Sequence, residues 1–568
     1  MRLRLPLALA ALLAASAPAA AQGVSADTPR RAVSPALAIT GARIVVAPGT
    51  VRERATVVVR DGRIVSVGDG PVPFDARVLA GDSLTVYAGF VDAFGYAGIP
   101  KPDEPEAYEG DRDAPPRQLA GIVPDTDARA LFDPTDAGVQ ALREAGFGAA
   151  HVVPREGLLS GEGSVVVLRA LGRGEGAGSL VLAGPLSAVM RIDTAPGVYP
   201  ATPMAVLATL RETVENARRA RAARGDRRGF ARLAADPALD ALGPLLDGER
   251  RLFFVAESAL DGFRVLRASD EMALAPVLVG VPDAAPLLDK LRETPVPVVA
   301  PLALPDTVKA DSAARAVPLA TTPSPGGVSF VSDRRTLSVE ALGAERTALT
   351  VQRRAAVRRA EGNAAALAAA GVPLAFGTLG VKPADVLPNL RRMVAAGLAA
   401  DAALGALTTG PAELLGLEGV LGTVEPGKLA NLVVTTGDLF ADSTALRYVV
   451  VEGALTEIDA DAAPAGDPDA VVVATGTWDL TVSTPGGDQT GTFELTGDAG
   501  DLAGTVSIDG DTLPLDTVTL VGNSLTMTFA APEVGDVTVT GIITDDAFEG
   551  TAELAFGTFP FTATRRPG

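Results

Sequence analysis

The sequence predicts an α/β protein built around a (β/α)8 TIM-like barrel, followed by an all-β antiparallel C-terminal domain. The chain has 568 residues, of which 47% are hydrophobic, which is enough for several domains at about 150 residues each. Strand-like apolar runs alternate with helical runs over residues 89–415, a pattern typical of parallel βαβ units and, at this length, of a (β/α)8 barrel. Short alternating segments between Gly and Asp turns fill residues 470–568, which indicates an antiparallel sandwich or barrel.

The amino terminus is typical of an export signal. Residues 1–21 contain Arg2 and Arg4, then an apolar run at 5–15, then small residues that predict cleavage at the end of the segment. The apolar run is too short to span a bilayer, and no later stretch reaches 18 uncharged apolar residues. We therefore expect an exported protein, periplasmic or extracellular, without a transmembrane segment. Residues 22–35 are small, polar and Pro-containing, which predicts a linker.

Short β runs flank the predicted barrel on both sides. Residues 36–86 contain such runs, with Asp61-Gly62 as a hairpin signal, and similar runs return at 416–458. Between them, residues 87–415 form the predicted barrel. Its strand-like runs lie at 146–154, 251–258, 275–282, 296–303 and 372–378. A second linker rich in Pro, Ala and Asp is predicted at 459–469.

Most of the acidity of the chain belongs to the C-terminal domain. Residues 461–568 hold 17 acidic residues and only two basic ones, a net charge of −15 out of −20 for the whole chain. This charge argues against a nucleic-acid partner, because phosphates would be repelled. Trp478 in the first strand of the domain is expected in its core, and surface or carbohydrate binding through this domain is one functional alternative.

The composition excludes several kinds of site. The chain has no cysteine, which excludes disulfides, thiolate-bound zinc, iron–sulfur clusters and a cysteine nucleophile. A single histidine, His151, excludes any site built from several imidazoles. His151 opens an apolar run on a predicted strand, where we expect it to be packed or hydrogen-bonded. Alone it cannot hold zinc without help from carboxylates.

Three segments carry a family resemblance. They are LTVYAGFVDAFGYAG (84–98), GFGAAHVVPREGLLSGEGSVVVL (146–168) and a C-terminal stretch (402–440) with the core GTVEPGKLANLV (422–433). Together they resemble the amidohydrolase superfamily, of the imidazolonepropionase and dihydroorotase kind, over residues 36–458. The resemblance implies that 36–86 and 416–458 join into one composite small β domain, as in the urease α chain.

The resemblance also implies a chemistry that the residues here do not match. Family members hydrolyse C–N bonds with one or two divalent metals, which polarise the carbonyl and activate water. Two histidines spaced two apart on the first strand point to the same side and meet one ion. Aligned by Asp92, these positions are Phe94 and Tyr96, and Leu379 stands where the family has an aspartate in Gly-Thr-Asp. The sequence thus predicts a degenerate member without a metal cofactor.

The resulting hypothesis is a catalytically inactive binding or partner protein. Its partner would be an intact amidohydrolase homologue or a second copy of the chain. Arg155, Glu156 and Glu162 follow the second strand, and the C-terminal ends of barrel strands face the pocket. These three are the candidates for contact with a small molecule; otherwise they are loop charges.

An active hydrolase is the alternative hypothesis. It would act on cyclic amides or dipeptide-like substrates, with zinc held by carboxylates or with no metal. Asp92, Glu162 and Glu257 are its weak catalytic candidates, and they would have to converge on one site. Glu257 and Asp261 are four residues apart, and two neighbouring carboxylates shift each other's pKa values. Charges at a helix start explain this pair equally well.

Overall fold

The computed structural model describes residues 36–102, 108–195, 197–225, 236–305, 339–441 and 444–458 of the chain. In the C-terminal part it describes 472–484, 487–497, 502–508, 511–531, 535–544, 546–554 and 557–566. The predicted export signal at 1–21 and the predicted linkers at 22–35 and 459–469 lie outside the described residues.

The first sheet combines strands from two distant parts of the sequence. Its order is β16-β15-β14-β5-β1-β2-β3, with β4 paired to β1. The strands are β1 (Leu37–Ala47), β2 (Thr50–Arg60), β3 (Arg63–Gly68), β4 (Arg77–Ala80), β5 (Thr85–Ala88), β14 (Leu432–Thr435), β15 (Leu446–Val451) and β16 (Ala454–Glu457). The two parts meet where β5 pairs antiparallel with β14. Because β5 extends to Ala88, the barrel begins slightly later than the predicted boundary at residue 87.

The second sheet forms the barrel, in the order β13-β12-β11-β10-β9-β8-β7-β6. Its strands are β6 (Phe90–Gly95), β7 (Phe147–Val152), β8 (Leu159–Val167), β9 (Val181–Arg191), β10 (Arg251–Val255), β11 (Pro276–Val279), β12 (Val298–Pro301) and β13 (Leu374–Gly377).

One strand of this sheet contradicts the predicted all-parallel pattern. Of the eight strands, β8 runs antiparallel to both of its neighbours, β7 and β9. The other pairs run parallel. Only residues 153–158 connect β7 to β8, which is enough for a hairpin but too short for the crossover that a parallel neighbour needs. The alternation of apolar runs did not distinguish these two directions.

The first and last strands of the sheet meet through hydrogen bonds. The backbone N–H of Thr378, directly after β13, donates to the Phe94 carbonyl on β6 at 3.1 Å. The same N–H donates to Asp92 Oδ1 at 2.9 Å, and the Thr378 hydroxyl donates to Asp92 Oδ2 at 2.5 Å. Asp92 therefore joins the two ends of the sheet into a barrel-like domain.

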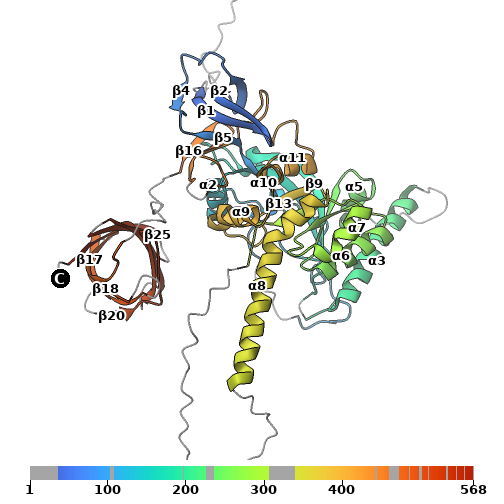
Figure 1. Cartoon of the computed structure of the whole chain (residues 1–568). Helices are drawn as coiled ribbons and strands as arrows, with labels where there is room; N and C mark the ends of the chain where they lie inside the picture. Colours follow the sequence, from blue (N-terminus) through green and yellow to red (C-terminus); the bar gives the residue numbers. More distant parts are fainter. Residues whose placement is uncertain are drawn as a thin grey trace, which may run out of the picture.

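Helices cover the outer side of the barrel strands (Figure 1). They are α1 (Ala128–Leu131), α2 (Ala137–Glu144), α3 (Pro203–Gly225), α4 (Pro237–Ala241), α5 (Gly243–Leu246), α6 (Ala259–Glu271), α7 (Leu288–Glu293), α8 (Val339–Ala369), α9 (Val386–Ala395), α10 (Ala400–Leu407) and α11 (Thr409–Leu415). The helical runs that the sequence contains between its strand-like runs lie at 136–146, 261–274, 345–371 and 388–398, and each overlaps one of these helices. No helix within the described ranges is long and apolar enough to cross a membrane.

The C-terminal domain is one antiparallel sheet in the order β20-β19-β18-β17-β25-β24-β23-β22-β21. The strands are β17 (Gly476–Thr484), β18 (Gly487–Thr496), β19 (Ala503–Ile508), β20 (Asp511–Pro514), β21 (Thr517–Val521), β22 (Ser524–Ala531), β23 (Gly535–Thr544), β24 (Ala547–Leu554) and β25 (Gly557–Arg565). The sheet curls around its own core (Figure 1). The sequence predicts about eight strands here; β20, with four residues, is the additional one.

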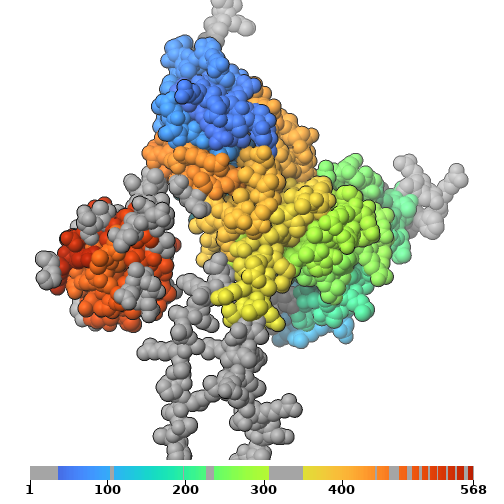
Figure 2. Space-filling view, in the orientation of Figure 1, coloured from blue at the N-terminus to red at the C-terminus, as the bar shows by residue number. Residues whose placement is uncertain are grey.

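Trp478 lies in the core of this domain, as predicted. Its side chain is fully buried and stacks on Phe493, with 5.7 Å between the ring centroids. Its indole N–H donates to the Ala474 carbonyl at 3.0 Å. Every buried side chain of this core comes from residues 474–563, and in Figure 2 the domain, in orange and red, has a surface of its own.

Candidate functional site

The interior of the barrel is filled by packed apolar side chains. Phe94 on β6 and Phe253 on β10 point inward and stack, with ring centroids 6.0 Å apart and an interplanar angle of 23°. Small and β-branched residues from the other strands complete this cluster, among them Ala149, Val165, Val189, Val277, Val299 and Ala375. We refer to Phe94, Phe253 and the side chains packed on them as the aromatic plug.

The positions that the family resemblance assigns to metal ligands belong to this plug or adjoin it. Phe94 is fully buried, and Tyr96 contacts it edge-on with ring centroids 6.3 Å apart. Leu379, which follows β13, is partly buried against the same apolar cluster. Burial raises the pKa of Tyr96 above its ordinary value, although the nearby Arg191 opposes this shift. A neutral phenol, a phenyl ring and an isobutyl group do not supply ligands for a divalent metal.

His151 lies inside the barrel as a packed residue. Its ring is fully buried beside Phe253, with 4.6 Å between the centroids. Nδ1 lies 2.8 Å from the Ala93 carbonyl, and Nε2 lies 2.8 Å from Ser187 Oγ. Both ring nitrogens therefore have partners. Burial lowers the pKa of His151 to about 4, so the ring is neutral at pH 7.

Asp92 is a fully buried carboxylate with three hydrogen-bond donors. Besides the two donors of Thr378, the Phe94 backbone N–H donates to Oδ1 at 3.0 Å. Burial raises the pKa of Asp92 to about 6, and these hydrogen bonds oppose the increase. A Cβ atom at position 95 would lie 2.0 Å from Asp92 Oδ2, so the glycine there leaves room for the carboxylate. Asp92 acts as a structural acceptor between β6 and β13.

Two arginines gather around Tyr96 at the C-terminal ends of the strands. The guanidinium carbon of Arg155, which follows β7, lies 4.6 Å from the centroid of the Tyr96 ring. The guanidinium carbon of Arg191, the last residue of β9, lies 5.6 Å from it. The C-terminal ends of the strands are the end at which barrel proteins hold their ligands. We refer to Arg155, Arg191 and Tyr96 as the arginine–tyrosine cluster.

Glu156 and Glu162 do not join this cluster. Glu156 is exposed on the loop between β7 and β8. Glu162 forms an ion pair with Arg250, and both side chains are largely buried. A Cβ at Gly163 would meet His151 inside the barrel; because side chains alternate along a strand, Glu162 points outward. Burial raises the pKa of Glu162, and the charge of Arg250 opposes that shift.

Glu257 and Asp261 lie at the start of α6, which follows β10. The Ser258 hydroxyl accepts a hydrogen bond from the Asp261 N–H at 3.2 Å and donates to its carboxylate at 2.7 Å. Asp261 also pairs with Arg264, whereas Glu257 is exposed. The Ser258–Asp261 pair is a helix N-cap, which accounts for an acid at this place.

The residues of the barrel do not fit a metal centre of the family type. In the described part of the chain, no three His, Asp or Glu side chains gather closely enough to hold an ion. The three carboxylates of the alternative hypothesis lie apart. Asp92 is inside the barrel, Glu162 is on its outer side, and Glu257 is at an exposed strand end. No catalytic step through a metal can be built from them.

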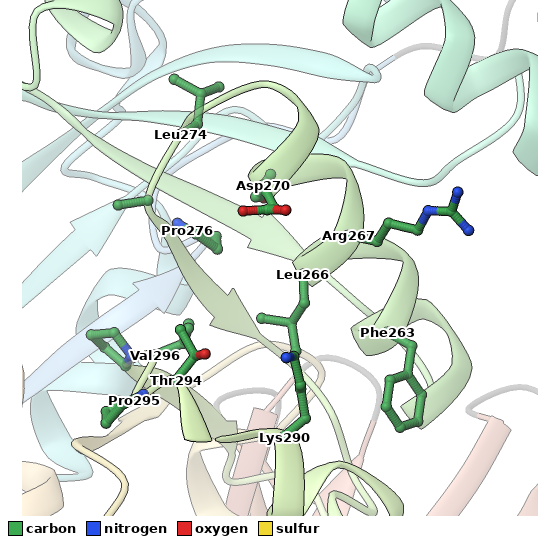
Figure 3. Close-up of a pocket in the computed structure, with 13 residues that line it drawn as sticks. Phe263, Leu266, Arg267, Asp270, Leu274, Pro276, Lys290, Thr294, Pro295 and Val296 are labelled. Carbon is green, nitrogen blue, oxygen red and sulfur yellow. The ribbon is translucent and has the colours of Figure 1, made fainter. Parts of the chain in front are cut away.

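A cavity of about 670 Å³ lies elsewhere, at the opposite ends of two strands. Its lining comes from α6, from α7 and from the segments that lead into β11 and β12 (Figure 3). Phe263, Leu266, Pro276 and Val296 make it largely apolar, and Lys290 contributes a charge. Active sites of barrels of this type lie at the C-terminal ends of the strands. This cavity is therefore separate from the candidate site.

Arg191 and Ser187 are the site residues that the sequence did not reveal. Both lie on β9, which sequence analysis did not identify as a strand. The usable signal is the run SAVMR (187–191), in which an arginine directly follows apolar residues at a strand end. Ser187 pairs with His151 only because β7 and β9 flank β8, a neighbourhood that depends on the unexpected antiparallel strand.

Comparison with known proteins agrees with this fold. The model of the amidohydrolase family matches residues 293–477. An amidohydrolase from Thermotoga maritima MSB8 is similar in structure, with 20% sequence identity and a TM-score of 0.55, over 74% of this chain and 99% of that one. A putative prolidase from Bifidobacterium longum aligns with 17% identity and a TM-score of 0.41, over 75% and 95%. No curated protein sequence matches the chain.

The match to the family model covers the last barrel strands and the return into the first sheet. The Thermotoga structure aligns over 99% of its own length with 74% of this chain. The predicted resemblance is therefore confirmed: this chain resembles the amidohydrolase superfamily, with a TIM-barrel-like domain and an additional antiparallel β domain.

Proposed function

We propose that this protein is a catalytically inactive amidohydrolase-like protein that functions by binding, not by metal-dependent hydrolysis. The proposal has three further parts. The barrel is a variant of the (β/α)8 barrel, the first sheet is the composite β domain of the family, and the chain is exported. Its partner is a small molecule, an intact amidohydrolase or a second copy of the chain.

The aromatic plug is the observation that carries this proposal. Replacing ligands one at a time would leave polar groups inside the barrel without partners, which costs about 1–3 kcal/mol each. Instead, Phe94 stacks on Phe253, His151 has two partners, and Asp92 has three donors. Partners for these three side chains are what a barrel adapted to a role other than metal chemistry would have.

The alternatives draw less support from the structure. An active carboxylate-based hydrolase needs Asp92, Glu162 and Glu257 in one place, and they lie apart. Binding through the C-terminal domain would be favoured by exposed aromatic side chains, but Trp478 is in the core. Trp478 therefore gives no argument for a carbohydrate site.

Hydrolysis assays on the purified full chain test the proposal. Dipeptides, N-acyl amino acids and cyclic amides are supplied in turn, with zinc, manganese or iron added. We expect no turnover above that of buffer with the same metal. The variant Asp92→Asn is the matched control, because Asp92 is the one fully buried carboxylate among the described residues and asparagine has the same shape. Chelator-sensitive turnover by the full chain would contradict the proposal, and its loss in Asp92→Asn would place that activity inside the barrel.

A further inference from the structure

The arginine–tyrosine cluster contains a buried cation without an acidic partner. Arg191 is 5% exposed. Its Nε donates to Ser160 Oγ at 3.2 Å and its Nη2 to the Pro154 carbonyl at 3.4 Å. Arg155 donates through Nε to the Ile99 carbonyl at 2.6 Å and through Nη2 to the Tyr96 carbonyl at 3.3 Å. Within the described residues, neither guanidinium forms an ion pair with a carboxylate.

Two other largely buried arginines of the same domain are paired with acids. Arg250 pairs with Glu162, and Arg169 pairs with Glu175 at 2.5 Å and with Glu452 at 2.7 Å. A buried charge is costly unless it is paired and hydrogen-bonded. Arg191 is more buried than either of these arginines, and a second cation lies over the same tyrosine ring. Two neighbouring positive charges in a partly desolvated place attract an anion.

Asp193, an acid whose charge acts on Tyr96, does not neutralise the cluster. Asp193 follows β9 and is exposed. It acts on Tyr96 only through its charge, as a minor contribution beside burial and Arg191. Arg191 also forms a hydrogen bond with the Tyr96 side chain. Because a guanidinium group carries five N–H donors, both arginines keep donors for a ligand, and guanidinium groups match the geometry of oxyanions.

We propose that the arginine–tyrosine cluster is a binding site for the carboxylate or phosphate group of a small molecule. Arg155 and Arg191 donate hydrogen bonds to the oxyanion, and Tyr96 holds the two guanidinium planes in place. The aromatic plug beneath closes the barrel, so the anion is held at the strand ends and is not processed. This inference deepens the proposed function and rests on it, since it names the class of ligand that the inactive barrel binds.

Ligand-observed fluorine NMR on the full chain tests this site. Trifluoroacetate is the carboxylate probe, and trifluoroacetamide is its uncharged counterpart. We expect line broadening for trifluoroacetate alone. Acetate and inorganic phosphate are then added separately as competitors: displacement by acetate only identifies a carboxylate site, and displacement by phosphate identifies a site for oxyanions in general.

Three variants connect the signal to the cluster. Arg191→Gln and Arg155→Gln each remove a charge-assisted donor, which we expect to weaken binding about tenfold or more. Arg155→Lys keeps the charge but loses the guanidinium fork, so we expect its affinity to lie between those of the unmodified protein and Arg155→Gln. Arg267→Gln on α6, whose side chain is 82% exposed, is the control for unspecific attraction and retains full binding. Circular dichroism checks that each variant is folded. If Arg191→Gln does not fold, the site is tested with Arg155→Gln, because Arg155 is only half-buried.

Equal broadening by trifluoroacetate and trifluoroacetamide, or unchanged binding in folded Arg155→Gln, would overturn the inference. Either result leaves the proposed function intact, because that function fails only through metal-dependent turnover. The two ideas are therefore tested separately.

Discussion

Asp92 and His151 are two ionisable side chains buried in the same barrel, and burial shifts their pKa values in opposite directions. A buried carboxyl group resists losing its proton, whereas a buried imidazole resists gaining one. Both groups have complete hydrogen-bond partners, so neither is poised for catalysis. Their effect on the protein is a dependence of stability on pH.

For Asp92 we predict a loss of stability as the pH rises. Its pKa is raised from 3.8 to about 6 in the folded protein, so the folded state binds the proton more tightly than the unfolded chain. Its contribution is fully present below about pH 3.8 and is lost as the pH rises through about 6. The difference amounts to roughly 3 kcal/mol. Asp92→Asn should lack this decline when the free energy of unfolding in urea is measured between pH 4 and 7.

For His151 the sign is reversed. Its pKa is lowered from 6.5 to about 4, so the unfolded chain binds the proton more tightly. The stability contribution is present above about pH 6.5 and is lost as the pH falls toward 4, again by roughly 3 kcal/mol. His151→Gln should remove this acid-dependent loss in urea unfolding. Ser187→Ala leaves the imidazole buried and should retain it; equal pH profiles for all three proteins would contradict the assignment.

The sequence identifies a site residue when a motif fixes its position. It does not identify a residue whose role comes from its neighbours in space. Phe94, Tyr96 and Leu379 were identified because the family motif fixes their positions relative to Asp92 and Thr378. Glu162 was misplaced as a pocket residue because its strand direction was unknown. Arg191 was missed because its importance comes from packing beside Tyr96, which lies 95 positions earlier in the sequence.

At the scale of elements, β8 is the feature that distinguishes this barrel. The strand inserts between β7 and β9 and brings Gly163 against His151. A Cβ on Gly163 would lie 2.4 Å from His151 Nε2 and 2.5 Å from Ser187 Oγ. The absence of a side chain is therefore a requirement of this crowded place, where three neighbouring strands meet.

We predict that Gly163→Ala destabilises the barrel by about 1–3 kcal/mol, because overpacking forces neighbouring side chains out of place. Gly178→Ala is the matched control: nothing lies within 4 Å of a Cβ there, and its φ is not in the left-handed region. Its effect on the free energy of unfolding should stay within about 0.5 kcal/mol. Equal effects of the two substitutions would show that β8 does not pack as described.

Helices were predicted more reliably than strand direction. Periodic apolar residues identify α2, α6, α8 and α9 because each helix shows its own pattern along the sequence. Strand direction depends on which strands become neighbours, and apolar runs are alike in parallel and antiparallel positions. The short connection between β7 and β8 is the feature of the sequence that indicates an antiparallel pair.

At the scale of the whole molecule, the C-terminal domain has a core of its own. Trp478 is the single tryptophan of the chain and is buried in that core. Tryptophan fluorescence therefore reports only on this domain, while circular dichroism near 222 nm reports on the helices around the barrel. We predict that Gly163→Ala shifts the dichroism transition in urea and leaves the fluorescence transition in place. Parallel shifts of both signals would mean that the two domains unfold as one unit.

The central claim is that packed aromatic and apolar side chains have replaced the metal centre of an amidohydrolase-like barrel. Equilibrium dialysis of the folded full chain against zinc at pH 7, followed by elemental analysis, measures this most directly. The account predicts far less than one tightly bound ion per chain, and the same value for Asp92→Asn. One tightly bound zinc per chain that is lost in Asp92→Asn would contradict it.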